Sequence, residues 1–244
     1  MRIDVITLFP GMFVGPLSEG IIGRAINDGI VSVHIVNLRD FCEGKHRQAD
    51  DKPYGGGAGM VLMAEPMFKA VESLSGENPL RRVVLTSAQG SLFSQAKARE
   101  LATEESLVII CGRYEGIDER VATGLNADEI SIGDYVLSGG ELPALVIIDA
   151  VARLIPGVVG SPESIEHDSF SKDLLGYPQF TRPPHLRGLS VPDVLISGHH
   201  AEIAKWRRRE AIRKTFRMRR GMLAGALLAA EEQEFVRQLE KGER

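Results

Sequence analysis

The first two thirds of this 244-residue chain alternate short β-rich runs with helical patterns, and this alternation constrains the fold most strongly. The β-rich runs predict strands at 3–9, 31–38, 82–86, 106–111 and 129–132, and the helical patterns fall at 21–28, 65–73, 94–102 and 141–154. Strands that alternate with helices form a parallel sheet whose two faces are both covered. We therefore expect an α/β fold with helices on both faces of a parallel sheet.

Three of the expected strands end in polar or glycine-rich turns: TSAQG at 86–90, CGRYEGID at 111–118 and SIGDYVLSGGE at 131–141. The carboxyl ends of parallel strands form one edge, where ligands bind in such folds, so the turns predict one pocket. A single glycine turn is more often only a tight turn, but the exposed backbone and apolar side chains at 135–137 would suit an adenine ring. The last two turns contain no lysine and their acids outnumber Arg113, which favours a cationic or zwitterionic ligand over a triphosphate.

Several classes of protein are excluded by what the sequence lacks. No apolar run reaches the roughly 18 residues that span a bilayer, and the first residues make a poor signal peptide. The familiar phosphate-binding loops and the G-x-S-x-G elbow are absent, and the two cysteines and six histidines show no metal-ligand spacing. Two isolated cysteines are typical of a reducing compartment, so we expect a cytoplasmic protein with no membrane partner.

Basic charge is concentrated towards the end of the chain. Residues 1–160 carry 14 Lys and Arg against 21 Asp and Glu, whereas residues 161–244 carry 15 against 12, and nine basic residues with one acid lie between 205 and 220. This block predicts a polyanionic partner; a solvated helix face is the simpler alternative, although such a face normally mixes both signs. Five prolines at 161–192 indicate a linker, followed by a helix capped by Ser197 and a last helix at 229–241.

Longer motifs cover almost the whole chain: IDVITLFP, DDKPYGGGAGM, LTSAQG, CGRYEGIDERV, SIGDYVLSGGELPALVIIDAVARLIPGV, DSF, TRP and LISGHHAEIAKWRR. With these motifs the sequence resembles the bacterial tRNA (guanine-N1)-methyltransferases of the TrmD type, in the SPOUT superfamily. The resemblance implies an S-adenosylmethionine pocket made by a deep trefoil knot, a homodimer with active sites at the subunit interface, and tRNA as partner. General topology rules would have argued against a knot.

The resemblance also implies a knotted catalytic domain at 1–160, a flexible linker carrying the catalytic aspartate at 161–172, and a small, mostly helical tRNA-binding domain at 173–244. Matched motif by motif, the cofactor pocket falls on Leu85, Thr86, Ser87, Gln89, Gly112, Tyr114, Glu115, Gly116, Ser131, Ile132, Gly133, Tyr135, Leu137, Gly139, Gly140 and Pro143. The candidate phosphate contacts on the basic helix are Lys205, Arg207, Arg208, Arg209, Arg213 and Lys214. Where the family often has an acid, this chain has Gly176, so any magnesium site that uses this acid is not assignable from the sequence.

The implied catalytic pair is Asp168 and Arg153. Guanine N1 carries a proton, and removing it pushes negative charge onto O6, so methylation needs a base near N1 and a cation or strong donor near O6. Asp168 would be the base and Arg153 the O6 partner, acting on the guanine at tRNA position 37 beside the anticodon. From spacing alone, Asp168 is better explained as a turn or N-cap residue, and Arg153 as a surface arginine that complements a helix dipole.

Two other functions stay open. The same fold could carry out methylation of a ribose 2′-hydroxyl, which needs no base for a ring nitrogen. A non-catalytic RNA-binding module that senses adenosyl ligands is the third reading. The identity of the methylated nucleoside, if any, separates the three.

Overall fold

The computed structural model describes residues 1–74, 82–160 and 168–242. The chain divides into two compact units, Met1–Gly160 and Ser161–Arg244, and each is described here by itself. Residues 161–167 of the expected linker lie outside the described residues, as do 243–244. The division into a catalytic domain, a linker and a tRNA-binding domain therefore stays a prediction.

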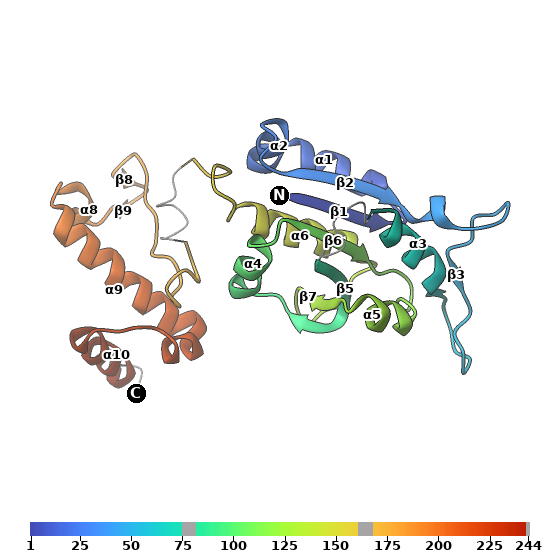
Figure 1. The fold of residues 1–244 in the computed structure, drawn as a ribbon. Coiled ribbons are helices and arrows are strands. Elements are labelled where there is room, and N and C mark those ends of the chain that lie inside the picture. Colours follow the sequence, from blue (N-terminus) through green and yellow to red (C-terminus); the bar gives the residue numbers. More distant parts are fainter. Residues whose placement is uncertain (75–81, 161–167, 243–244) are drawn as a thin grey trace. The chain divides into compact units, whose positions relative to one another are not determined.

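A parallel sheet forms the centre of the first unit (Figure 1). Among the described residues it has five strands in the order β2-β1-β6-β5-β7, each parallel to its neighbours. The strands are β1 (Arg2–Thr7), β2 (Ser32–Asn37), β5 (Arg82–Leu92), β6 (Ser106–Cys111) and β7 (Asp128–Ser131). The expected α/β fold with a parallel sheet is confirmed.

Helices cover both faces of this sheet because its central strands are apolar on both sides. In β6, Leu107 and Ile109 belong to one buried core, and Val108 and Ile110 belong to another. The first core includes residues of α2 (Gly20–Asn27), α4 (Gln95–Ala102) and α6 (Glu141–Ala152), and the second includes residues of α3 (Ala64–Leu74) and α5 (Glu119–Leu125). Burying each such side chain contributes about 1.5–3 kcal/mol, so both layers stabilise the sheet.

Two elements of the first unit differ from expectation. Helix α5 was not expected; it begins after Asp118, whose carboxylate accepts a hydrogen bond from the backbone N–H of Arg120 at 3.0 Å and so caps the helix. Strand β5 was expected to end at Thr86 but continues to Leu92, because β7 pairs with it again after a register shift between Thr86 and Ser91. The shift acts as a bulge that keeps the TSAQG segment beside the sheet edge.

Short elements complete the first unit. The glycine-rich segment expected as a loop is closed at its base by β3 (Asp50–Asp51) and β4 (Val61–Leu62), which pair antiparallel. The other short helices are η1 (Pro10–Phe13), α1 (Val14–Ser18) and η2 (Leu38–Phe41).

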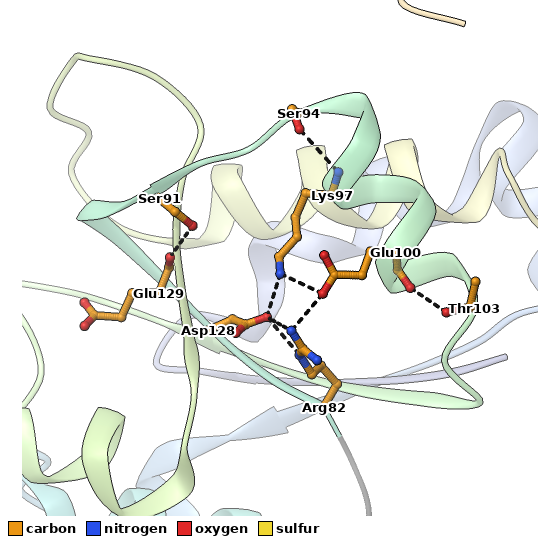
Figure 2. A network of polar contacts seen from close by, with 8 residues as sticks. All are labelled: Arg82, Ser91, Ser94, Lys97, Glu100, Thr103, Asp128 and Glu129. Atoms are coloured by element: carbon orange, nitrogen blue, oxygen red, sulfur yellow. Dashed lines mark hydrogen bonds and ion pairs between the residues drawn. The ribbon is translucent and has the colours of Figure 1, made fainter.

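A four-charge network joins three elements of the first unit (Figure 2). Arg82 of β5 contacts Asp128 of β7 at 2.6 Å and Glu100 of α4 at 2.8 Å, and Lys97 of α4 contacts the same two carboxylates at 3.0 and 2.9 Å. Burial alone would raise the pKa of Asp128, but hydrogen bonds from Lys97 and Arg82 outweigh it, so this pKa lies below its usual value. Because Arg82 and Asp128 are the first residues of β5 and β7, the network fixes α4 against the amino ends of these strands, at the sheet edge opposite the expected ligand edge.

The second unit is built around a long helix. Its elements are α8 (Asp193–Ile196), α9 (His200–Arg219), η3 (Arg220–Ala224), α10 (Ala230–Gly242) and the hairpin of β8 (His185–Leu186) and β9 (Leu189–Ser190). Leu174, Ile212 and Phe235 lie in its core. The expectation that Ser197 caps the long helix is wrong: Ser197 follows α8 and its hydroxyl donates to the carbonyl of Val194, so the new helix starts only at His200.

Candidate active site

A cavity of about 390 Å³ lies at the carboxyl edge of the sheet in the first unit. All sixteen residues predicted for the cofactor pocket line this cavity. The three turns expected from the sequence thus meet in one place, as the strand order requires. Lining residues outside the predicted set are Ala88, Arg113, Ile117, Asp118, Glu119, Ala122, Glu129, Ile130, Val136 and Ser138.

Hydrogen bonds interlock the three turns. The hydroxyl of Thr86 donates to the carbonyl of Ile110 at 3.1 Å and accepts from the backbone N–H of Gly112 at 3.2 Å. The N–H of Gly140 in turn donates to the carbonyl of Gly112 at 2.8 Å, and Arg113 pairs with Gly139 in an isolated antiparallel bridge. The cavity wall is therefore one bonded backbone assembly rather than three independent loops.

Glycine is required at two points of this wall by close packing. A Cβ atom at Gly140 would collide with the Thr86 hydroxyl and lie 2.7 Å from the N–H of Gly112. At Gly112 it would lie 2.8 Å from the carbonyl oxygen of Thr86. Both distances are shorter than an atom can accept, so any side chain would push the turns apart.

A buried ion pair between Arg113 and Glu141 holds the second and third turns together. Glu141, the first residue of α6, is fully buried and accepts from Arg113 at 2.9 Å and from the Thr7 hydroxyl at 2.8 Å. The Arg113 guanidinium also donates to the carbonyl of Ser138 at 2.8 Å and lies 4.4 Å from the centre of the Phe9 ring. Arg113 is thus engaged within the protein, which leaves it poorly suited to bind a ligand phosphate.

Among the charged side chains that line the cavity, acids predominate. Four carboxylates line it, those of Glu115, Asp118, Glu119 and Glu129, against the single guanidinium of Arg113. This balance favours a ligand with positive charge. Cys111, the last residue of β6 and the first of the second turn, is buried; this burial and then the nearby Glu141 carboxylate raise its pKa well above the usual value, so the thiol is a poor nucleophile at neutral pH.

The glycine-rich segment 50–60 is attached to the second turn. The backbone N–H of Glu115 donates to the carbonyl of Met60, and that of Leu62 donates to the carbonyl of Gly116, both at 3.0 Å. A Cβ atom at Gly59 would overlap the Glu115 side chain. The sequence predicted the loop but not its contact with the cavity turn, because residues far apart in the chain make that contact.

The two predicted catalytic residues lie in different units. Arg153 is the C-cap residue of α6 in the first unit, and its N–H donates to the carbonyl of Asp149 at 3.2 Å. Asp168 belongs to the second unit, where its carbonyl accepts from the N–H and hydroxyl of Ser171, and it lines a second cavity of about 800 Å³ with Arg207 and Arg208. The pairing of Asp168 with Arg153 therefore stays a prediction.

The basic residues of α9 fall into two groups. Arg208 makes a bidentate contact with Glu232 of α10, with its Nε 2.8 Å from the carboxylate, and this hydrogen bond lowers the pKa of Glu232. Arg213 pairs with Glu210, and Arg209 lies 4.4 Å from the centre of the Phe235 ring. These arginines have partners within the unit and are not simply solvated, and their expected contacts with tRNA phosphates stay a prediction.

The remaining basic residues are more available to a partner. Lys205 and Lys214 are exposed, and so is Arg217, which was not in the predicted set. Lys214 and Arg217 are three residues apart on α9 and lie on one exposed face with Arg207. Arg207 itself lies 5.0 Å from the Tyr177 ring centre.

No cluster of three or more His, Cys, Asp or Glu side chains that could hold a metal ion occurs within the described residues. At Gly176 the backbone N–H donates to the Ser169 hydroxyl at 2.8 Å, and this position brings no carboxylate. Likewise, none of the described helices is both long and apolar enough to cross a membrane.

Comparison with known proteins identifies the family. A family model described as tRNA (Guanine-1)-methyltransferase TrmD matches residues 1–225. This chain belongs to the TrmD family. Curated relatives named tRNA (guanine-N(1)-)-methyltransferase include that of Geobacter metallireducens, 52% identical over 99% of both chains, and that of Moorella thermoacetica, 54% identical over 100% of this chain and 98% of the relative. A third TrmD relative, from Pelotomaculum thermopropionicum, is 55% identical over 98% of this chain and 96% of its own length.

Proposed function

We propose that this protein is a tRNA (guanine-N1)-methyltransferase that uses S-adenosylmethionine to methylate the guanine at tRNA position 37. The observation that carries the proposal is the single cavity lined by all sixteen residues that match the family's cofactor motifs. Family membership over residues 1–225 and relatives of nearly equal length support the same reaction.

The cavity suits the proposed methyl donor in charge and shape. Its four carboxylates favour a ligand with a sulfonium and an ammonium charge, and its backbone turns can bond the edge of an adenine while Tyr135 and Leu137 contact the ring. Gly112 and Gly140 let the turns that form the cavity wall pack closely against one another. When bound, the sulfonium supplies an electrophilic methyl group.

The protein's own part is to prepare guanine for attack. Asp168 accepts the N1 proton as the new bond to carbon forms, which frees the N1 electron pair, and Arg153 donates to O6, where negative charge develops. An ordinary aspartate has a pKa of about 3.9 and is a weak base, so positioning next to N1 must supply most of its effect. Exposed basic residues of α9 hold tRNA phosphates and position the substrate.

We also infer that the first unit contains the trefoil knot and that two copies form a dimer with shared active sites. Gly140 of the third turn donates a hydrogen bond to Gly112 of the second turn and packs closely against Thr86 of the first turn, and this close packing of the three turns supports such threading. Exposed apolar side chains next to the cavity support an interface: Leu142 and Val146 lie one turn apart on α6, and Val136 is 89% exposed. A tRNA substrate and two free cysteines fit a cytoplasmic enzyme.

Nucleoside mass spectrometry tests the proposed reaction. The protein is incubated with S-adenosylmethionine and unmodified tRNA that has guanine at position 37, and the RNA is then digested. We expect N1-methylguanosine, and none from a matched tRNA with adenine at this position. A 2′-O-methyl nucleoside would replace the proposal with ribose methylation, and no product with measurable ligand binding would favour a sensor.

A further inference from the structure

An aromatic groove in the second unit is not used by the proposed chemistry. It has a volume of about 430 Å³ and lies between the segment 177–196 and α9. Tyr177, Phe180 and Trp206 line it, and the Phe180 and Trp206 ring centres lie 6.3 Å apart with planes at 56°. Phe180 is 47% exposed, and Ile196, which also lines the groove, is exposed as well. Tyr177 packs against the unit's core around Ile212 and Phe235, whereas Phe180 and Trp206 do not belong to this core.

The surroundings of this groove are strongly basic. Arg182 and Arg207 belong to its lining, which includes no carboxylate. Residues 177–220 carry eleven Lys and Arg against three Asp and Glu. Lys214 and Arg217 extend the exposed basic surface along the same face of α9 as Arg207. A partner in this groove should therefore combine a flat apolar part with negative charge.

We propose that this groove binds an unstacked nucleobase from a single-stranded part of the tRNA, stacked on the exposed faces of the Phe180 and Trp206 ring pair, with the flanking phosphates against Arg182 and Arg207. The inference rests on the proposed function, since it assumes a tRNA substrate. Proteins that hold single-stranded nucleic acid combine aromatic platforms with a basic groove in this way. An apolar segment of a second copy would cover the rings but would leave both arginines without an anionic partner.

Trp206 gives a direct measurement, because it is the chain's one tryptophan. Titration with unmodified tRNA should quench its fluorescence saturably as the base stacks on the ring. S-adenosylmethionine should not, because the cavity proposed for it belongs to the first unit. Fluorescence that stays constant while tRNA binds, as measured by filter retention, would overturn the proposal.

A matched pair of variants tests the groove without touching the core. Phe180→Ala should weaken tRNA binding about tenfold, because stacking is worth about 1–3 kcal/mol per base and 1.4 kcal/mol is tenfold. The control, Leu189→Ala, removes a side chain that is 76% exposed on the β8–β9 hairpin and outside the groove, and should bind normally. Phe180→Ala should leave the slope of log affinity against log salt unchanged, whereas Arg182→Gln should reduce its magnitude by about 0.7–0.9.

The outcomes separate this inference from the proposed function. If the unaltered protein binds no tRNA, both fail. If tRNA binds but no N1-methylguanosine forms, the proposed function fails while a fluorescence response still supports the groove. Normal tRNA binding by Phe180→Ala overturns the groove proposal alone. If this variant binds tRNA normally but sediments as a monomer, the groove is instead a contact between two copies of the chain.

Discussion

At the scale of single residues, Gly140 is the position in the cavity wall with the least space for a side chain. A methyl group there would overlap the Thr86 hydroxyl and press on Gly112, so Gly140→Ala must displace the third turn. We expect a stability loss of about 1–3 kcal/mol and at least a tenfold weaker S-adenosylmethionine affinity by calorimetry. Gly15→Ala is the control, because a Cβ at this exposed site on α1 meets no atom within 4 Å. Equal ligand affinity in both variants would contradict the role of Gly140.

Asp168 is the second residue whose role can be isolated. Asp168→Asn should lower turnover about 10²–10⁴-fold, the usual contribution of a general base. Affinity for S-adenosylmethionine should not change, because Asp168 does not line the first unit's cavity. Asp173→Asn, which alters another carboxylate of the same second cavity, should remain active. Turnover within a few-fold of the unaltered enzyme in Asp168→Asn would exclude Asp168 as the base.

The residues that line the cavity could be predicted from the sequence, but the ion pairs that hold these residues in place could not. The turns could be predicted because glycine and polar residues after β-rich runs identify strand ends, and motif matching then selected the lining. The Arg113–Glu141 pair could not be predicted, since the two residues are 28 positions apart on different elements and their charges alone name no partner. The ion pair between Arg208 and Glu232 could not be predicted either, because counting charges along the chain leaves Arg208 as an RNA contact or a solvated residue and does not identify Glu232 as its partner.

At the scale of elements, the packing of α4 against β5 and β7 depends on ionised Asp128. Its pKa is depressed in the folded state, so its contribution is present above the unfolded value of about 3.9 and is lost as the pH falls through the lower folded value. Asp128→Asn should cost about 1 kcal/mol at pH 7. The difference from the unaltered protein should shrink below about pH 4.

Thermal unfolding followed by circular dichroism at pH 7 and at pH 3 measures this effect. Glu129→Gln is the control, because this neighbour on β7 lies outside the four-charge contacts in Figure 2. If Asp128→Asn is still less stable than the unaltered protein by the same amount at pH 3, the loss of stability comes from altered packing and not from the lost charge.

The two groups of basic residues on α9 make a second prediction for an element. Replacing both Lys214 and Arg217 with Gln should weaken tRNA binding and reduce the salt slope by about 1.4–1.8 in magnitude, because each phosphate contact contributes about 0.7–0.9. Fluorescence anisotropy with labelled tRNA at several salt concentrations measures the slope. Replacing Arg237 and Lys241 with Gln removes the same charge from α10; an equal change in slope would mean that net charge rather than the α9 face binds tRNA.

The ends of helices and strands were harder to predict from the sequence than the elements themselves. The strands and long helices were predictable because apolar periodicity follows from burial on two sheet faces. The extension of β5 to Leu92 was not, because it depends on a second pairing with β7 after a register shift. Ser197 was assigned to the wrong helix end, since the same serine chemistry that caps a helix start also closes the turn after α8.

At the scale of the whole molecule, the two units differ in net charge, and this difference matches the two proposed ligands. The first unit has the acidic excess and the acid-lined cavity, and the second has the basic excess and the aromatic groove. A cationic methyl donor and a polyanionic RNA would thus each meet a complementary surface. The predicted catalytic pair has one member in each unit, and the proposed dimer shares its active sites, so the proposal can be tested by asking whether cavity and base come from different copies.

Complementation tests that assembly. Asp168→Ala should be inactive because it lacks the base, and Gly140→Ala should have little activity when S-adenosylmethionine is kept well below the concentration that saturates its weakened cavity. If each site combines the cavity of one copy with the Asp168 of the other, a mixed dimer has one intact site and one doubly altered site. Random exchange makes half of the dimers mixed, so activity should recover to about a quarter of normal. Differently tagged copies, co-purified in sequence, establish that mixed dimers form, and mixed dimers without activity would place cavity and base within one chain.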